Sequence, residues 1–142
     1  MERGYAVLDR TWEDGDAVSL SMDLPVRRVF ANPRVREDVG KVAVARGPLV
    51  YCLEEEDNGS GLQRRYLPDA AAFEERRAHG LPDEIAALVS EGRTLSLSDW
   101  AEDELYGGRA PSFGDCTLTW IPYYAWANRS PGEMTVWVHR LP

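Results

Sequence analysis

The most constraining feature of this sequence is a run of aromatic residues between Leu118 and Val138. Three of the chain's five tryptophans and two of its six tyrosines fall in this run. Each such ring can remove roughly 150–250 Å² of surface from water, so rings this close together belong to a core or to a binding platform. Apolar and polar residues alternate on both sides of the run, which is the period of a β-strand. The run therefore predicts a strand, an aromatic corner and a second strand.

The N-terminal part of the chain has the pattern of paired strands. Apolar and polar residues alternate from Val18 to Leu24, after an Asp14-Gly15 pair that favours a tight turn. Together with the short run from Tyr5 to Arg10, this pattern predicts an antiparallel hairpin with one apolar face. The run from Val26 to Phe30 predicts another short strand.

The middle of the chain contains an apolar run and one helical pattern. The run from Val42 to Leu53 predicts a central strand that is kinked at Gly47, because the proline that follows cannot donate to a ladder. The acidic stretch that comes next predicts a solvated loop. Proline in the first turn, acidic residues and apolar spacing of three and four predict a short helix from Pro82 to Glu91. Alternation around Leu95 predicts a strand after that helix.

Several short strands, turn signals between them and one helix together predict an all-β fold. We expect an antiparallel β-sandwich or jelly roll with one short helix in an inserted loop. A chain of 142 residues with 44% hydrophobic residues has the size and composition of one ordinary domain.

The charge and the apolar runs argue against two classes of partner. The formal net charge of −8 and the absence of a basic stripe argue against nucleic acid, whose phosphates require clustered Lys and Arg. No apolar run approaches the ~20 residues that span a bilayer, and the first residues lack the apolar stretch of a signal peptide. We therefore expect a cytoplasmic protein without membrane contact.

The sequence contains no evident active site. Glycosidases commonly use a pair of carboxylates, but the acidic residues are here predicted to be surface groups. Those considered are Glu54, Glu55, Glu56, Asp57, Asp115 and Glu133. His79 and His139 lack a neighbouring nucleophile or metal-ligand spacing. Cys52 and Cys116 lack zinc-site spacing and are predicted to be buried thiols, with a disulfide or metal role as the alternative. We predict no catalytic, cofactor-binding or metal-binding residue.

The aromatic corner is the candidate site, with two interpretations. Its rings could stack on sugars, or they could fill the core, and strand spacing favours the core for Trp120. Asn128 and Arg129 follow and could satisfy backbone groups, with Arg129 paired to an acid or stacked on a ring. The candidate residues for carbohydrate binding or for a structural corner are Trp120, Tyr123, Tyr124, Trp126, Asn128 and Arg129.

Three blocks of the chain, in this order and spacing, resemble the C-terminal portion of glycoside hydrolase family 127. The blocks are Gly4 to Asp16, Val42 to Glu54 and Pro122 to Trp137. Members of this family are β-L-arabinofuranosidases and their relatives. The resemblance implies a much longer enzyme, in which an (α/α)6 barrel carries a catalytic glutamate and a zinc-bound cysteine nucleophile, and β-sandwich domains follow. Neither Cys52 nor Cys116 matches that cysteine, so the resemblance implies no zinc or other cofactor in this chain.

The resemblance also implies a domain division. Residues 1–35 would be end strands of a preceding β-sandwich, and residues 36–142 would form the C-terminal β-sandwich domain. The start within the first sandwich departs from the family pattern and fits a split or truncated gene product. An apolar hairpin without its partner strands needs cover, so we expect self-association, with a second copy or a catalytic domain as the partner.

Three functions are consistent with these observations. The first is a non-catalytic accessory domain that supports the catalytic barrel, dimerisation or both; the chain alone is then inactive. The second is a free-standing carbohydrate-binding module, for which Trp126 and Tyr124 would be exposed. The third is a small enzyme whose acids converge only in three dimensions, for which a pocket would hold two carboxylates about 5–10 Å apart.

Overall fold

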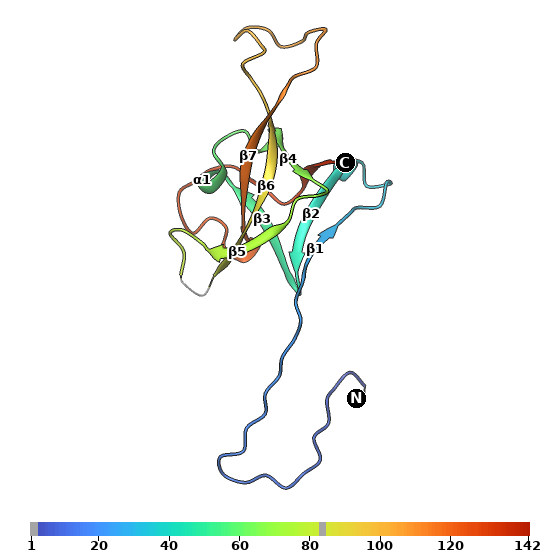
Figure 1. The fold of residues 1–142 in the computed structure, drawn as a ribbon, viewed down its shortest axis with the longest axis vertical. Helices are drawn as coiled ribbons and strands as arrows, with labels where there is room; N and C mark the ends of the chain where they lie inside the picture. Colours follow the sequence, from blue (N-terminus) through green and yellow to red (C-terminus); the bar gives the residue numbers. More distant parts are fainter. Residues whose placement is uncertain (1–2, 83–84) are drawn as a thin grey trace.

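The computed structural model describes residues 3–82 and 85–142, and its strands form one continuous sheet that closes on itself (Figure 1). Within the described residues the strands are β1 Val26–Val29, β2 Lys41–Arg46, β3 Leu49–Glu54, β4 Arg65–Pro68, β5 Phe73–Arg77, β6 Ala86–Leu95, β7 Phe113–Pro122, β8 Met134–Thr135 and β9 Val138–Leu141. The helical elements are one short α-helix and three 3-10 turns: α1 Glu55–Asn58, η1 Arg36–Asp38, η2 Leu62–Arg64 and η3 Tyr123–Ala125.

Six strands form a closed barrel in the order β2, β9, β4, β6, β7, β3 and back to β2. The pairs around it are antiparallel except for β4 and β9, which run parallel with Tyr66 beside His139. The expected all-β class is confirmed, but the pairing is that of a barrel with one parallel pair and not of a purely antiparallel sandwich. The C-terminal strand β9 is the reason, because it lies between β2 and β4 and joins edges that a sandwich would leave apart.

The barrel core is filled from alternate positions of its strands. Leu118 and Trp120 of β7 and Tyr51 and Leu53 of β3 are buried in the main cluster. The intervening residue Cys52 is also buried, in a second cluster on the other face of the sheet. Both faces of β3 are therefore covered, as its continuous apolar sequence indicates.

Two local predictions in the middle of the chain are wrong. Gly47 does not kink one strand: with φ of 53° it lies in a turn, after which β3 pairs antiparallel with β2. The predicted helix from Pro82 to Glu91 is also absent, because β6 begins at Ala86; residues 83 and 84 lie outside the described residues. β6 pairs with β5 and β7 on its two edges, and this pairing prevails over local helix propensity.

The acidic stretch after β3 is a solvated loop only in part. Glu56, Gly59 and Ser60 are exposed, but residues Glu55–Asn58 form α1, and Glu54 at the end of β3 is only 2% exposed. The strand predicted from the alternation around Leu95 is confirmed only in part, since β6 ends at that residue and Leu97 is exposed beyond it. The short strand from Val26 is confirmed as β1.

The N-terminal segment extends away from the barrel (Figure 1). The predicted Asp14-Gly15 turn forms, with the Asp16 amide donating to the Glu13 carbonyl at 3.1 Å. The predicted hairpin does not, because the first strand of the described chain is β1 at Val26. The alternating apolar side chains from Val18 to Leu24 are instead exposed to solvent.

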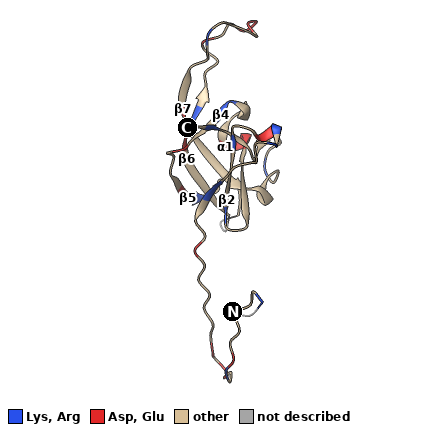
Figure 2. Cartoon of the chain, turned by 90° about the vertical axis from the view of Figure 1, so that its right-hand side faces the viewer, with Lys and Arg blue, Asp and Glu red and all other residues tan. Residues whose placement is uncertain are grey.

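Charged residues are spread over several elements of the barrel and its loops (Figure 2). Among the residues that the structure describes, no helix is both long enough and apolar enough to cross a membrane.

We predict that Gly92→Ala destabilises the barrel. A Cβ at this buried position of β6 would lie 2.4 Å from Leu118 Cγ in the main core cluster. Overpacking of this kind typically costs about 1–3 kcal/mol. Gly114→Ala in the paired strand β7 is the matched control, because its Cβ would meet only Thr94 Cγ2 at 3.8 Å. Urea unfolding of both variants tests the prediction, and equal stabilities would contradict it.

Candidate functional site

The aromatic corner begins where β7 ends at Pro122. The η3 turn follows, closed by the Trp126 amide donating to the Tyr123 carbonyl at 3.2 Å. Proline fixes its own φ and has no amide to continue a ladder, so the chain leaves the sheet at this residue. Strand, aromatic corner and returning strand are therefore present, although the returning part is split into β8 and β9.

The six candidate residues divide into an inner and an outer group. Trp120 is fully buried and its indole donates to Ser90 Oγ at 3.1 Å, so it belongs to the core. The rings of Tyr123, Tyr124 and Trp126 are exposed, at 47%, 60% and 39%. Tyr123 and Trp126 stack on each other, with centroids 6.1 Å apart and planes at 29°. The outer group thus presents aromatic faces to solvent.

Arg129 belongs to the inner group and holds a buried ion cluster. Its guanidinium lies 2.5 Å from both Glu54 Oε2 and Asp57 Oδ2 and also donates to the His79 carbonyl at 2.8 Å. The three charged side chains are 6%, 2% and 10% exposed. The hydrogen bond to Asp57 is the main cause that raises the pKa of Arg129 above its ordinary value. The prediction that Arg129 pairs with an acid is confirmed.

The ion cluster also fixes the backbone of the corner. Glu54 Oε1 accepts the amide of Ala127 at 3.0 Å, and Ala127 has a φ of 62°, which is unusual for a residue with a Cβ. The Asn128 amide group donates to the Ala125 carbonyl at 3.0 Å. Asn128 and Arg129 therefore help to hold the backbone of the corner in place.

Asn58 of α1 connects the same region to the sheet. Its side chain donates to the Thr119 carbonyl and accepts the Thr119 amide, both at 2.9 Å. The side-chain amide of Asn58 thus bonds the backbone groups of Thr119 as a neighbouring strand would. Because α1 also contains Asp57, which pairs with Arg129, the helix lies beside Arg129.

A hollow of about 610 Å³ lies beside the aromatic corner. Its lining comes from η1, β2, β3, η3, β8 and the residues after β8: Asp38, Lys41, Val50, Tyr123, Met134, Thr135, Val136 and Trp137. Of the six predicted site residues only Tyr123 lines it. Sequence reasoning missed Asp38 and Lys41, since no local pattern links them to residues about ninety positions later.

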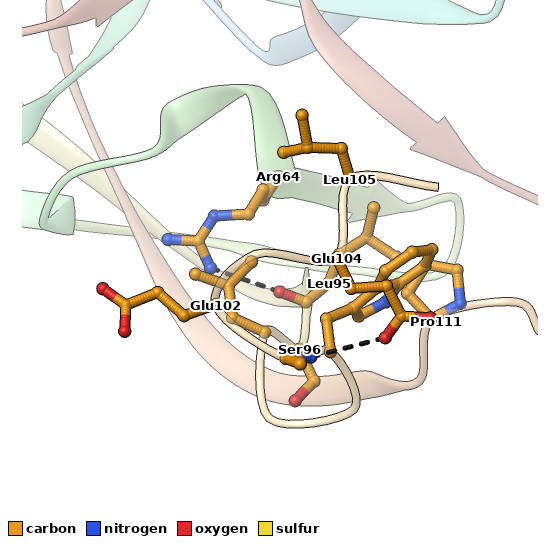
Figure 3. A pocket seen from close by; sticks show the side chains of 10 residues that line it. Arg64, Leu95, Ser96, Glu102, Glu104, Leu105 and Pro111 are labelled. Atoms are coloured by element: carbon orange, nitrogen blue, oxygen red, sulfur yellow. Dashed lines mark hydrogen bonds between the residues drawn. The ribbon is translucent and has the colours of Figure 1, made fainter. Parts of the chain in front are cut away.

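A second hollow, of about 590 Å³, lies in the extension between β6 and β7 (Figure 3). Arg64 reaches it from η2 and donates to the Leu95 carbonyl at 3.2 Å, and Glu104 accepts the Ala101 amide. At the tip of the extension Leu105 and Tyr106 are 80% and 93% exposed. This extension is a second region that presents apolar side chains to solvent.

None of the acids considered from the sequence lines either hollow, whereas Glu102 and Glu104 line the second one. Glu54 and Asp57 come close to each other through Arg129, but they are buried and neutralised by the guanidinium. Within the described residues no group of three or more His, Cys, Asp and Glu could hold a metal ion.

Of the remaining titratable candidates, His79 is exposed, whereas the two cysteines and His139 are at least partly buried. Cys52 and Cys116 are free thiols, and burial raises the pKa of Cys52 to about 12. His139 stacks on Tyr66 at 4.9 Å, and burial lowers the pKa of its imidazole.

Comparison with known proteins relates the barrel to a family of enzymes. The sequence matches the glycoside hydrolase family 127 C-terminal domain over residues 26–139. It is 38% identical, over 149 aligned positions, to a non-reducing end β-L-arabinofuranosidase of Bifidobacterium longum subsp. longum; the alignment covers 99% of this chain and 22% of that protein.

Solved structures give the same relation. The crystal structure of a family 127 β-L-arabinofuranosidase from Geobacillus stearothermophilus T6 superposes with a TM-score of 0.78 and 42% identity, over 83% of this chain and 18% of that one. Another family 127 β-arabinofuranosidase superposes with a TM-score of 0.68 and 36% identity, over 83% and 17% of the two chains. This chain thus spans about a fifth of the length of these relatives.

We predict that Arg129→Met strongly destabilises the chain. Removal of the guanidinium leaves Glu54 and Asp57 as buried carboxylates without their cation, which typically costs about 3–5 kcal/mol. Adding Glu54→Gln and Asp57→Asn should recover part of the loss. Arg76→Met, which removes an exposed ion pair with Glu74, is the control and should change stability little. Chemical unfolding measures all three proteins, and a single Arg129→Met variant as stable as the parent would refute a structural role.

We also predict unequal reactivity of the two thiols. Cys52 is fully buried with a raised pKa, so it should not react with a thiol reagent in mildly alkaline buffer until the chain unfolds. Cys116, which is half-buried, should react in the folded state. Spectrophotometric thiol titration of the parent and of Cys116→Ser, with and without denaturant, separates the two. Fast reaction of native Cys116→Ser would show that Cys52 is accessible.

Proposed function

Because the chain belongs to glycoside hydrolase family 127, whose C-terminal domain it matches over most of its length, we propose that it is a non-catalytic accessory domain of a β-L-arabinofuranosidase-like enzyme. The observation that carries this proposal is the extent of the match. Residues 26–139 include eight of the nine strands of the described chain and the first two residues of β9, yet this chain corresponds to only 22% of one relative. Catalysis in such an enzyme would belong to the other parts of the polypeptide.

The use of the acids supports an accessory role. The acid groups of a glycosidase must be able to reach the substrate, whereas Glu54 and Asp57 are held by Arg129 under the surface. Glu133, another acid considered from the sequence, accepts the amides of Gly61 and Leu62 at 2.9 and 2.8 Å. These acids stabilise loops of the domain itself, and this structural use supports a non-catalytic role.

The exposed apolar residues support contact with a protein partner. Val18, Leu20 and Met22 are 61%, 79% and 64% exposed on the N-terminal segment. Contiguous exposed apolar surface marks interaction sites, and an extended segment with an unpaired backbone can add to the edge of a sheet. We propose that this segment packs against the catalytic part of the enzyme or, in the isolated chain, against a second copy.

We predict that the purified chain is an inactive dimer. A chromogenic β-L-arabinofuranoside should remain intact with and without added zinc, and light scattering after size-exclusion chromatography should give twice the chain mass at micromolar concentration. Leu20→Ser with Met22→Ser should shift the dimer towards monomer, because it removes the apolar face of the segment. Tyr106→Ser, at the equally exposed tip of the β6–β7 extension, is the control and should leave the dimer intact.

Two outcomes would contradict this proposal separately. Hydrolysis of the arabinofuranoside would disprove the non-catalytic role and direct mutagenesis to Glu54 and Asp57. A strictly monomeric parent chain would disprove self-association while leaving the inactive accessory role in place.

A second candidate function is carbohydrate binding, and one observation favours it. Tyr124 and Trp126 are exposed, as a sugar-binding module requires, and the stacked pair of Tyr123 and Trp126 forms an aromatic surface at the same corner. Sugar rings present apolar C–H faces that pack on such rings. An accessory domain can also bind a glycan, so this function is compatible with the first.

A further inference from the structure

We propose that the hollow between Tyr123 and Trp137 is a binding site for a neutral oligosaccharide. This inference rests on the second of the two functions proposed above, and it moves the site away from the outward-facing rings of Tyr124 and Trp126. Its lining combines aromatic rings, other apolar side chains and two charged groups that are partly exposed.

The hollow is open to solvent and large enough for a small ligand. Its volume of about 610 Å³ is within the ~300–1,000 Å³ typical of ligand sites. Tyr123 contributes from η3 and Trp137 from the segment between β8 and β9, so the two rings come from opposite ends of the aromatic run. Val50, Met134 and Val136 add apolar surface. Rings and apolar groups of this kind suit the C–H face of a sugar.

The two charged groups of the lining suit hydroxyl groups. Asp38 supplies a carboxylate that only accepts hydrogen bonds, and Lys41 supplies an ammonium that only donates them. In the described part of the chain neither side chain has a hydrogen bond or ion pair with another residue. A sugar hydroxyl both donates and accepts, so it can bind to either group. A phosphorylated or otherwise anionic ligand would instead meet the carboxylate of Asp38 and a chain of net charge −8.

A neighbouring hollow indicates more than one sugar unit. This hollow has a volume of about 370 Å³ and shares Lys41, Met134, Thr135 and Trp137 with the first. It adds Gln63, an amide that donates and accepts, and His139. Trp137 and Lys41 thus stand between two adjoining hollows, where a linear glycan could place one unit on each side of the indole.

The experiment titrates the complete chain with methyl β-L-arabinofuranoside and with xylotetraose, a neutral pentose oligosaccharide. Proton–nitrogen correlation spectra follow the indole N–H of each tryptophan, and calorimetry gives the affinity. We expect the Trp137 indole resonance to shift and xylotetraose to bind more tightly than the monosaccharide. Trp137→Ala should weaken binding roughly tenfold or more, as removal of a central contact does, and Asp38→Asn should weaken it by a smaller but measurable factor. Asp38→Asn changes only a partly exposed group, so it tests the site even if Trp137→Ala unfolds the chain.

Two control variants distinguish the possible failures. Tyr106→Ala removes a ring that is 93% exposed on the β6–β7 extension and should bind as the parent does. The double variant Tyr124→Ala with Trp126→Ala removes the outward-facing rings. If only this double variant loses binding, the hollow is refuted while carbohydrate binding stands. If neither sugar binds to the parent chain, the hollow and carbohydrate binding are both refuted, and the accessory role is unaffected.

Discussion

The buried pairing of Arg129 with Glu54 and Asp57 is the interaction on which the candidate site depends. It joins three segments that are far apart in the sequence: the end of β3, α1 and the loop after η3. Burial of charge is unfavourable unless the partners and their hydrogen bonds are in place, and here the carboxylates accept from Arg129 and from the Ala127 amide. Because the loss of one partner would leave the others buried and uncompensated, the geometry of the corner is strongly specified.

The same pairing explains why the aromatic residues separate into two groups. Trp120 precedes the corner and points into the barrel, while the left-handed backbone at Ala127, held by Glu54, directs the chain back towards the sheet. The rings of Tyr123, Tyr124 and Trp126 lie in the turn between these points and remain outside. An aromatic-rich run can therefore serve the core and present a surface at once. The choice between core and platform, which the sequence posed for the whole run, has a different answer for each ring.

The sequence allowed prediction of the features that depend on neighbouring residues. The two-residue period of β7, the Asp14-Gly15 turn and the pairing of Arg129 with an acid all follow from local pattern or simple chemistry. Features decided by distant partners could not be predicted. Residues 86–91 satisfy a helical pattern, but β5 and β7 supply partners on both edges and make them a strand. Glu54 has the composition of a solvated acid, and only the position of Arg129, 75 residues later, makes it a buried one.

The closure of the barrel and the hollow beside Tyr123 also depend on residues that are distant in the sequence. The hollow needs β2 and β8 side by side with η3, and nothing near Asp38 or Lys41 in the sequence refers to the aromatic run. The registers of β2 with β9 and of β3 with β8 bring them together. Such sites are built by topology, so even a correct list of strands would not reveal them without the order in which the strands pair.

The acids of this chain show how a barrel of short strands can present fixed loops. Glu54 and Asp57 hold the corner, Glu133 holds the start of η2 through two amides, and Asp99 binds Ser112 across the base of the β6–β7 extension. A loop that is already ordered loses less conformational entropy when it binds, whether its partner is a glycan or another part of an enzyme. Acids used in this way cannot also act as a general acid or nucleophile, because both roles need a carboxylate that is open to the substrate. The carboxylates of Glu54, Asp57 and Glu133 are thus committed to holding loops in place.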